Sequence, residues 1–173
     1  SLDDESIASF LDNDKYPMVV KLDEVGIQGG KIKLCHTKQD AKDHFQYLLQ
    51  VIASSKNGTS AQIICQEFLR GVEVMVDSVS HNSKHKTCMV WRYDKRPANG
   101  ERHVNFGMIP MASESHEAAL AIPYVSQCLT AMRMKNGPSH AKCIVTIDGP
   151  ILIELNFRAH GGDGSWCHLA KAL

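Results

Sequence analysis

The sequence has little that would bring it to a membrane or to a polyanion. No apolar run reaches the roughly 20 residues that a membrane-spanning helix needs, and the first residues show no signal-peptide pattern. The chain has 19 Lys and Arg residues against 19 Asp and Glu residues, so its formal net charge at pH 7 is zero. Without a field of one sign, we expect neither nucleic acid nor an anionic membrane as a partner.

The six cysteines lack the spacing of a metal or redox motif. No C-x-x-C pair occurs, and most of the cysteines lie in apolar runs, where the thiol behaves as a small buried hydrophobic group. We therefore expect neither a disulfide framework nor a zinc site, and the composition favours the reducing cytoplasm.

Short strands and two amphipathic helices alternate along the 173 residues, a length that suits one domain or two small subdomains. Thr37 and Asp40 have the spacing of a helix N-terminal cap, and Ser113 is predicted to cap a second helix. Asp148–Gly149 is a dipeptide typical of tight hairpin turns. The pattern predicts an α+β fold with mostly antiparallel sheets.

The most informative segment is a strand-like run that ends in alternating polar residues. Alternate side chains of a strand share one face, so Glu154, Asn156 and Arg158 are predicted to point the same way. Carboxylate and amide oxygens suit Mg²⁺, and a guanidinium suits a phosphate or an acyl-phosphate. Gly161 and Gly162, which follow, let backbone N–H groups approach an anion. Taken alone, an edge strand with a polar outer face explains these residues equally well.

Two earlier segments carry related chemistry. Lys21 ends a buried-type strand and precedes a loop with Gly29 and Gly30, so its ammonium group is placed to reach a phosphate. A flexible hairpin turn explains this loop about as well. Further along, an extended stretch at Glu67 can offer backbone groups to an adenine edge, and Glu73 can accept hydrogen bonds from ribose hydroxyls. An ordinary turn with an exposed acid is the alternative there.

Together, four segments resemble the ATP-grasp superfamily in their order and separations. They are Tyr16–Lys21 with its glycine loop, Gln66–Glu73, Gly137–His140 and Gly149–Arg158. Within that superfamily the chain looks most like the carboxylate–amine ligases related to bacterial L-amino-acid ligases. The resemblance covers about Tyr16 to Gly162. It implies an ATP-grasp fold, in which two α+β subdomains with mostly antiparallel sheets hold ATP between them.

The resemblance implies both an organisation and a reaction. Residues 1–15 would form a helical lead-in, residues 16–69 the small lid subdomain, and residues 70–173 the large metal-binding subdomain, cut short at its C-terminal helix. ATP would phosphorylate a substrate carboxylate, and an amine would attack the acyl-phosphate to form a peptide or amide bond. The expected partners are a small carboxylic acid, an amine such as an amino acid, and the missing domains of a longer chain.

Roles for individual residues also follow from the resemblance. Lys21 would hold the ATP phosphates, with Gly29 and Gly30 in the loop over them, Glu67 and Leu69 would bind adenine through their backbones, and Glu73 would bind ribose. Glu154 and Asn156 would ligate Mg²⁺, for which Mn²⁺ could substitute, and Arg158 would steady the acyl-phosphate. The loop at the reacting carboxylate would be lined by His160, Gly161 and Gly162.

One residue departs from the family pattern. Where these ligases place a second acidic metal ligand, two residues after His140, this chain has Lys142. A charge pair about 4 Å apart is worth roughly 4 kcal/mol at a surface-like dielectric, so a cation at this position should weaken Mg²⁺ binding. Three interpretations stay open: Lys142 turns its stem away, the alignment slips by one strand pair, or the chain is a nucleotide-binding module with weakened or lost ligase activity.

Other polar groups have simpler explanations. His81 and His85 flank a hairpin turn and are interpreted as solvated histidines in preference to metal ligands. The basic stretch from Lys84 to Arg96 is interleaved with aromatic residues, as a nucleic-acid groove would require, but zero net charge favours a solvated hairpin face. Lys95 or Arg96 could instead contact ATP phosphates or substrate.

Overall fold

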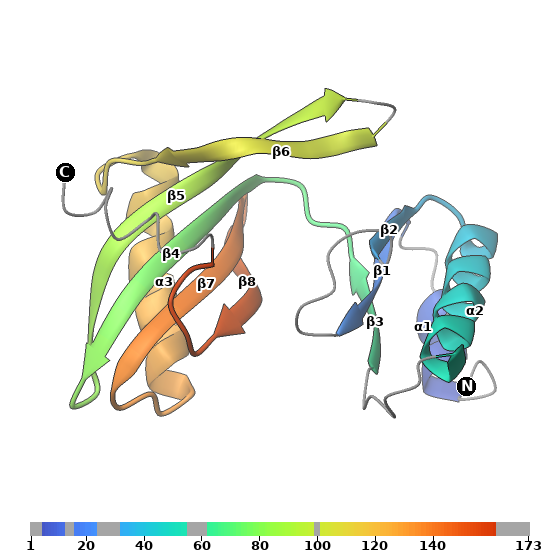
Figure 1. The fold of residues 1–173 in the computed structure, drawn as a ribbon, viewed down its shortest axis with the longest axis horizontal. Helices are drawn as coiled ribbons and strands as arrows, with labels where there is room; N and C mark the ends of the chain where they lie inside the picture. Colours follow the sequence, from blue (N-terminus) through green and yellow to red (C-terminus); the bar gives the residue numbers. More distant parts are fainter. Residues whose placement is uncertain (1–4, 13–15, 24–31, 55–61, 99–100, 162–173) are drawn as a thin grey trace. The chain divides into compact units, whose positions relative to one another are not determined.

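The structure, a computed structural model, describes residues 5–12, 16–23, 32–54, 62–98 and 101–161. The chain divides into two compact units whose boundary in sequence falls between Phe68 and Leu69. Each unit has its own sheet and its own helix cover (Figure 1). None of the described helices is long and apolar enough to cross a membrane.

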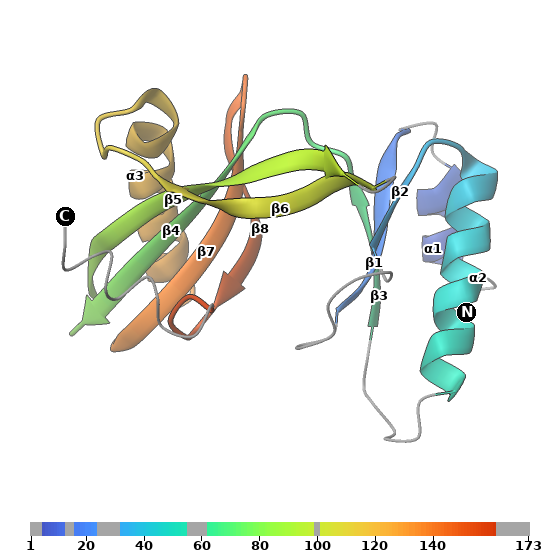
Figure 2. The ribbon, with the colours of Figure 1, turned by 45° about the horizontal axis from the view of Figure 1, so that its top comes forward.

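The first unit is a three-stranded antiparallel sheet with two helices on one side, as Figures 1 and 2 show. The strand order is β2-β1-β3. Its elements along the chain are α1 (Glu5–Asp12), β1 (Met18–Asp23), β2 (Ile32–Cys35), α2 (Lys38–Ser54) and β3 (Gln62–Glu67).

The helices of the first unit cover one face of β1. Met18, Val20 and Leu22 alternate along the strand and are buried together with Phe45 of α2. Leu11 of α1 is fully buried in the same cluster. The segment expected as a lead-in therefore contributes to the core of the first unit.

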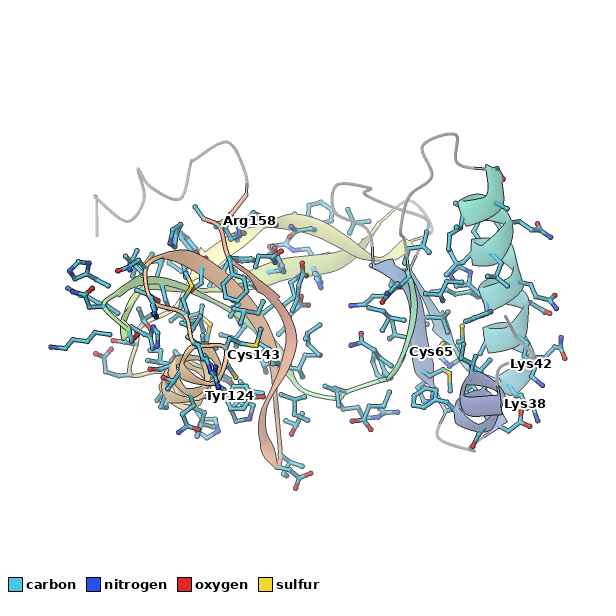
Figure 3. The ribbon with its side chains drawn as sticks, turned by 90° about the horizontal axis from the view of Figure 1, so that it is seen from below. Lys38, Lys42, Cys65, Tyr124, Cys143 and Arg158 are labelled. Atoms are coloured by element: carbon cyan, nitrogen blue, oxygen red, sulfur yellow. The ribbon has the colours of Figure 1, made fainter. Side chains whose placement is uncertain are left out.

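Hydrogen bonds and ion pairs of side chains hold the first turn of α2. The Asp40 N–H donates to Thr37 Oγ1 over 3.1 Å, and the Asp40 carboxylate accepts from the His36 N–H over 3.2 Å, which confirms the predicted cap. Lys38 and Lys42, labelled in Figure 3, lie 2.6 Å and 3.5 Å from the carboxylate of Asp12 in α1. The hydrogen bond from Lys38 lowers the pKa of Asp12.

The second unit is a five-stranded antiparallel sheet crossed on one face by a single described helix. The strand order is β6-β5-β4-β7-β8. Its elements along the chain are β4 (Val72–His81), β5 (Lys84–Ala98), β6 (Glu101–Pro110), α3 (His116–Ala131), β7 (Gly137–Thr146) and β8 (Gly149–Asn156). The predicted hairpin at Asp148–Gly149 is confirmed, since β7 and β8 pair on either side of it and Gly149 has a φ of +116°.

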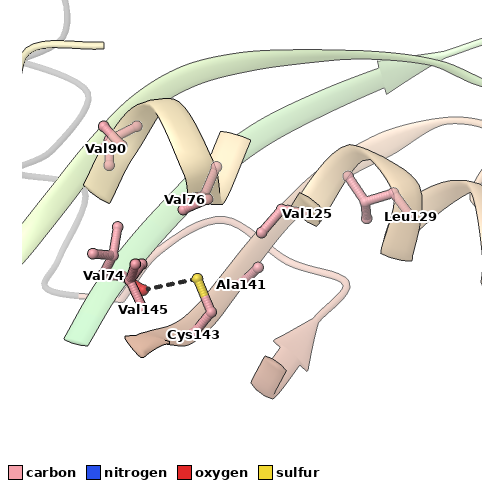
Figure 4. Packing of buried hydrophobic residues seen from close by; sticks show 10 residues of the cluster. Val74, Val76, Val90, Val125, Leu129, Ala141, Cys143 and Val145 are labelled. Carbon is pink, nitrogen blue, oxygen red and sulfur yellow. Dashed lines mark hydrogen bonds between the residues drawn. The ribbon is translucent and has the colours of Figure 1, made fainter. Parts of the chain in front are cut away.

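The core of the second unit lies between α3 and the sheet. Figure 4 shows its valines, leucine, alanine and cysteine: Val74, Val76, Val90, Val125, Leu129, Ala141, Cys143 and Val145. The Cys143 thiol points to the carbonyl oxygen of Val74 over 3.7 Å. Burial raises the pKa of Cys143 to about 11, so this thiol is protonated at neutral pH and has a packing role.

The start of α3 corrects one prediction. The helix begins at His116 with Ser115 as its N-cap, because the first helical bond runs from the Ala119 N–H to the Ser115 carbonyl. The side chain of Ser113, the predicted cap, instead donates to Glu114. A tight turn before Ser115 delays the helix, and the spacing of polar residues does not reveal that turn.

A glycine allows β4 to begin against β7. A Cβ added to Gly71 would lie 2.2 Å from the carbonyl oxygen of Val145, closer than any side chain tolerates. Because Gly71 has no side chain, Val72 can pair with Val145. This pairing sets the position of Glu73, the next residue of β4.

Candidate functional site

The face of the five-stranded sheet opposite α3 collects polar side chains from four neighbouring strands. Since side chains alternate along a strand, these residues are interleaved with those of the core. They are Glu73 and Asp77 of β4, Trp91, Tyr93 and Lys95 of β5, His140 and Lys142 of β7, and Glu154 and Asn156 of β8.

Four charges of alternating sign run across this face. Lys95 pairs with one oxygen of Glu73, and the Lys142 ammonium lies 3.8 Å from the other. The same ammonium lies 3.7 Å from Glu154 Oε2. Both lysines also stand over the ring of Tyr93, at 5.3 Å and 5.6 Å from its centre. Burial and, to a lesser extent, the Glu73 carboxylate raise the pKa of Tyr93, so its hydroxyl group keeps its proton at neutral pH.

A buried hydrogen-bond network lies beside the charged row. The Asp77 carboxylate accepts from Trp91 Nε1 and pairs with His140 Nδ1, each over 2.7 Å. Because an ionised carboxylate only accepts, this contact places a proton on His140 Nδ1. The His160 ring stands edge-on to His140, with centroids 4.4 Å apart. The loop after β8 therefore packs on the centre of the sheet.

The predicted strand face is only partly observed. Glu154 and Asn156 lie together, and Asn156 Nδ2 donates to Glu154 Oε1 over 2.9 Å. Because β8 ends at Asn156, Arg158 lies in the following loop, beyond the strand (Figure 3), and donates to the carbonyl of Ala159 over 3.0 Å. In the same loop, His160 Nδ1 contacts the Gly161 carbonyl, and its buried Nε2 has no hydrogen-bond partner among the described residues.

The donors at this site suit a divalent cation only in part. Glu154 and Asn156 supply one carboxylate and one amide group, which fits a Mg²⁺ ion that takes its remaining ligands from phosphate and water. Within the described ranges, no group of three or more His, Cys, Asp or Glu side chains could hold a metal ion. The described side chains therefore offer two of the ligands that a phosphate-bound ion would need and do not build a closed metal site.

Lys142 does not turn away from the site. The β7–β8 register pairs Lys142 directly with Glu154. Its ammonium lies between two carboxylates, and the side chain is only 25% exposed. The residue at which the resemblance predicts an acidic ligand is thus a lysine that lies between Glu73 and Glu154.

Of the candidate residues, Lys21 and Glu67 lie in the first unit and Leu69 begins the second; β1 continues past Lys21 to Asp23, so the prediction that Lys21 ends its strand is wrong. Lys21 of β1 pairs with Ile32 and Ile64 and alternates with the buried residues, so it lies on the face away from the helices. Glu67 ends β3, and Leu69 follows it outside any strand. Three further candidates, Gly29, Gly30 and Gly162, lie outside the described residues.

Other sequence candidates have local partners. His85 contacts Ser80 over 2.8 Å, and His81 contacts Asn82 over 3.2 Å. Arg96 forms an ion pair of 2.6 Å with Asp94, whereas Lys95 joins the charged row. Of the two basic residues considered for phosphate contact, only Lys95 therefore lies on the candidate site.

The buried network around Asp77 has no local signal in the sequence. The spacing of Glu73, Met75 and Asp77 places them on one face of β4 but does not identify their partners. The partners of Asp77 lie 14 and 63 residues away along the chain, so local patterns could not pair them.

The comparisons with known proteins identify the family. A family profile described as phosphoribosylglycinamide synthetase, ATP-grasp (A) domain, matches residues 2–163. The chain therefore belongs to the ATP-grasp family, and the predicted resemblance is confirmed.

Individual relatives indicate the branch. The chain is 26% identical over 148 residues to dapdiamide A synthase of Enterobacter agglomerans, across 85% of this chain and 34% of that protein. The L-amino acid ligase from Bacillus licheniformis has the same fold, with a TM-score of 0.73 and 19% identity over 94% of this chain and 39% of that one. The sequence match supports the carboxylate–amine ligase branch, and the structural match shows a shared fold.

A more distant relative shares the fold. The biotin carboxylase domain of 2-oxoglutarate carboxylase from Hydrogenobacter thermophilus, solved with magnesium ADP, has a TM-score of 0.69 and 12% identity over 95% of this chain and 36% of that one. The chain spans between a third and two fifths of the length of these three relatives.

Proposed function

We propose that this chain is the ATP-binding part of a ligase that joins a carboxylic acid to an amine, with cleavage of ATP to ADP and phosphate. The observation that carries the proposal is the polar face of the second unit, which Glu154 and Asn156 of β8 share with Glu73 of β4 and Lys95 of β5. Membership of the ATP-grasp family and the similarity to dapdiamide A synthase support it.

We assign separate parts of nucleotide binding to two subdomains, which correspond closely to the two units. We assign residues 16–69 to the lid subdomain and residues 70–173 to the metal-carrying subdomain. Lys21 and the loop with Gly29 and Gly30 would bind phosphates. The backbones of Glu67 and Leu69 would bind adenine. Glu73 would bind ribose, and its contact with Lys95 fixes the direction of its carboxylate.

The reacting groups would lie at the end of β8. Glu154 and Asn156 would hold one Mg²⁺ or Mn²⁺ ion, which supplies charge neutralisation to the phosphates when bound. Arg158 would orient the acyl-phosphate by its planar fork of N–H donors. The loop with His160, Gly161 and Gly162 would line the reacting carboxylate and exclude water.

The reaction needs positioning more than covalent help from the protein. A carboxylate oxygen of the acid attacks the γ-phosphorus of ATP, and ADP leaves. The amine nitrogen then attacks the carbonyl carbon of the acyl-phosphate, loses a proton and expels phosphate. We propose small acids and amines, such as amino acids, as the substrates. The remaining domains of the whole protein would be the partners of this part, and the location would be the cytoplasm.

The release of ADP tests this function. The whole protein should release ADP from Mg·ATP only when an acid and an amine are both present, in amounts equal to the amide formed. A coupled assay for ADP, run over pairs of amino acids with mass spectrometry of the products, measures both quantities.

Omission of each component separates the outcomes. ADP release that continues without the acid or without the amine contradicts the ligase proposal. ATP binding measured by calorimetry, with no ADP release for any pair, would favour the second candidate, a nucleotide-binding module without ligase activity, which the position of Lys142 motivates.

A further inference from the structure

Lys142 is held between two carboxylates by charge. Its ammonium lies 3.8 Å from Glu73 Oε1 and 3.7 Å from Glu154 Oε2, and both distances are longer than a direct N–H···O hydrogen bond. Its N–H groups are therefore able to turn towards a third acceptor without breaking a short bond. Lys142 and Glu73 are each only 25% exposed, so water screens their attraction only in part.

The local charges already balance without a bound ion. Lys95, Glu73, Lys142 and Glu154 alternate in sign across β5, β4, β7 and β8, so two ammonium groups face two carboxylates. Tyr93 lies beneath both ammonium groups and adds the attraction of its ring face. The row is neutral, which lets it form in the free protein at little electrostatic cost.

A lysine can reproduce the charge of an acid that holds a divalent cation. One carboxylate and one divalent cation together carry a single net positive charge, and an ammonium group carries the same charge. The ammonium group donates hydrogen bonds to phosphate oxygens where a metal ion would coordinate them. Because it is covalently attached, it is present at any concentration of free metal.

We propose that Lys142 is a built-in cation that takes the place of one divalent ion at the phosphates of the nucleotide. The proposal rests on the proposed function, since it concerns the same site. It assigns Lys142 to phosphate binding and leaves Glu154 and Asn156 as the ligands of the only divalent ion bound at this face. The protein should then bind a nucleotide with one fewer divalent ion than a variant with an acid at this position.

The number of bound ions per nucleotide tests this proposal without turnover. The whole protein is saturated with β,γ-imido-ATP and titrated with Mn²⁺, and free Mn²⁺ is followed by its paramagnetic resonance signal. The wild-type protein should bind one Mn²⁺ ion per nucleotide, and Lys142→Glu should bind two. In Lys84→Glu, the same charge change at the exposed first residue of β5 should leave the count at one.

Two further variants separate charge from packing. Lys142→Met keeps an unbranched stem over Tyr93 but lacks the charge, so nucleotide affinity should fall about tenfold with the count still at one. Lys142→Arg keeps the charge and should restore most of that affinity. Calorimetry with β,γ-imido-ATP measures both.

Several results would overturn the proposal. An equal Mn²⁺ count in the wild-type protein and Lys142→Glu, or unchanged affinity in Lys142→Met, would show that Lys142 does not replace an ion. Nucleotide binding by Lys142→Glu alone would show that the lysine blocks the site. These outcomes leave the proposed binding of ATP intact. Absence of nucleotide binding in the wild-type protein and in every variant would contradict the proposed function as well.

Discussion

Replacement of Glu154 by glutamine should lower ATP-dependent amide formation by on the order of a thousandfold while leaving the fold unchanged. The side chain of Glu154 is 47% exposed, so its loss of charge does not disturb a core. Glutamine keeps the length of the side chain and an oxygen that can accept from Asn156. What disappears is the negative charge that would hold a divalent ion beside the phosphates. The ratio kcat/KM for ADP release, measured with the amide product, reports the effect.

A matched control comes from an acid outside the site. Glu114 lies in the exposed turn before α3, and Glu114→Gln should leave turnover within about twofold of the wild-type rate. Urea unfolding of both variants checks that the fold is retained. Full turnover by Glu154→Gln would remove this residue from the proposed machinery and weaken the assignment of the whole polar face.

Replacement of Asp77 by alanine should reduce the free energy of unfolding of the second unit by about 3–5 kcal/mol. Trp91 Nε1 and His140 Nδ1 both lose their acceptor, and each unsatisfied buried donor costs about 1–3 kcal/mol. The variant also leaves a small cavity beside Nε1 of Trp91, a side chain that is fully buried. Urea denaturation followed by tryptophan fluorescence measures the change.

Two other variants define the source of this loss. Val79→Ala, on the same strand but 45% exposed, should change stability by less than about 1 kcal/mol. Asp77→Asn keeps one acceptor oxygen and should lose about half as much as Asp77→Ala. If the alanine variant loses no more than Val79→Ala, the network is not a stabilising element of the sheet.

The parts of the fold that follow local rules could be predicted from the sequence. The cap at Thr37 and Asp40 and the turn at Asp148–Gly149 are determined by neighbouring residues, and both are confirmed. The α+β class with antiparallel sheets also follows from the strand and helix periods, because each period shows which face is buried. The ATP-grasp family was reached from the order of four such segments.

The parts that depend on tertiary contacts could not be predicted. The turn that moves the N-cap of α3 from Ser113 to Ser115 has no sequence pattern of its own. The pairing of Asp77 with His140 requires β4 and β7 to be neighbours, which strand order alone decides. The orientation of Lys142 likewise depends on the register with β8, and Arg158 leaves the strand face because β8 ends two residues before it.

The transfer of oxygen from the acid to phosphate tests the central claim most directly. The acid is labelled with ¹⁸O in both carboxylate oxygens and incubated with Mg·ATP, the amine and the whole protein, and the released phosphate is analysed by mass spectrometry. A carboxylate oxygen becomes the bridge of the acyl-phosphate and leaves with phosphorus, so the account predicts one ¹⁸O atom in each phosphate formed with the amide. Unlabelled phosphate, or release of AMP and pyrophosphate, would contradict activation of the acid as an acyl-phosphate.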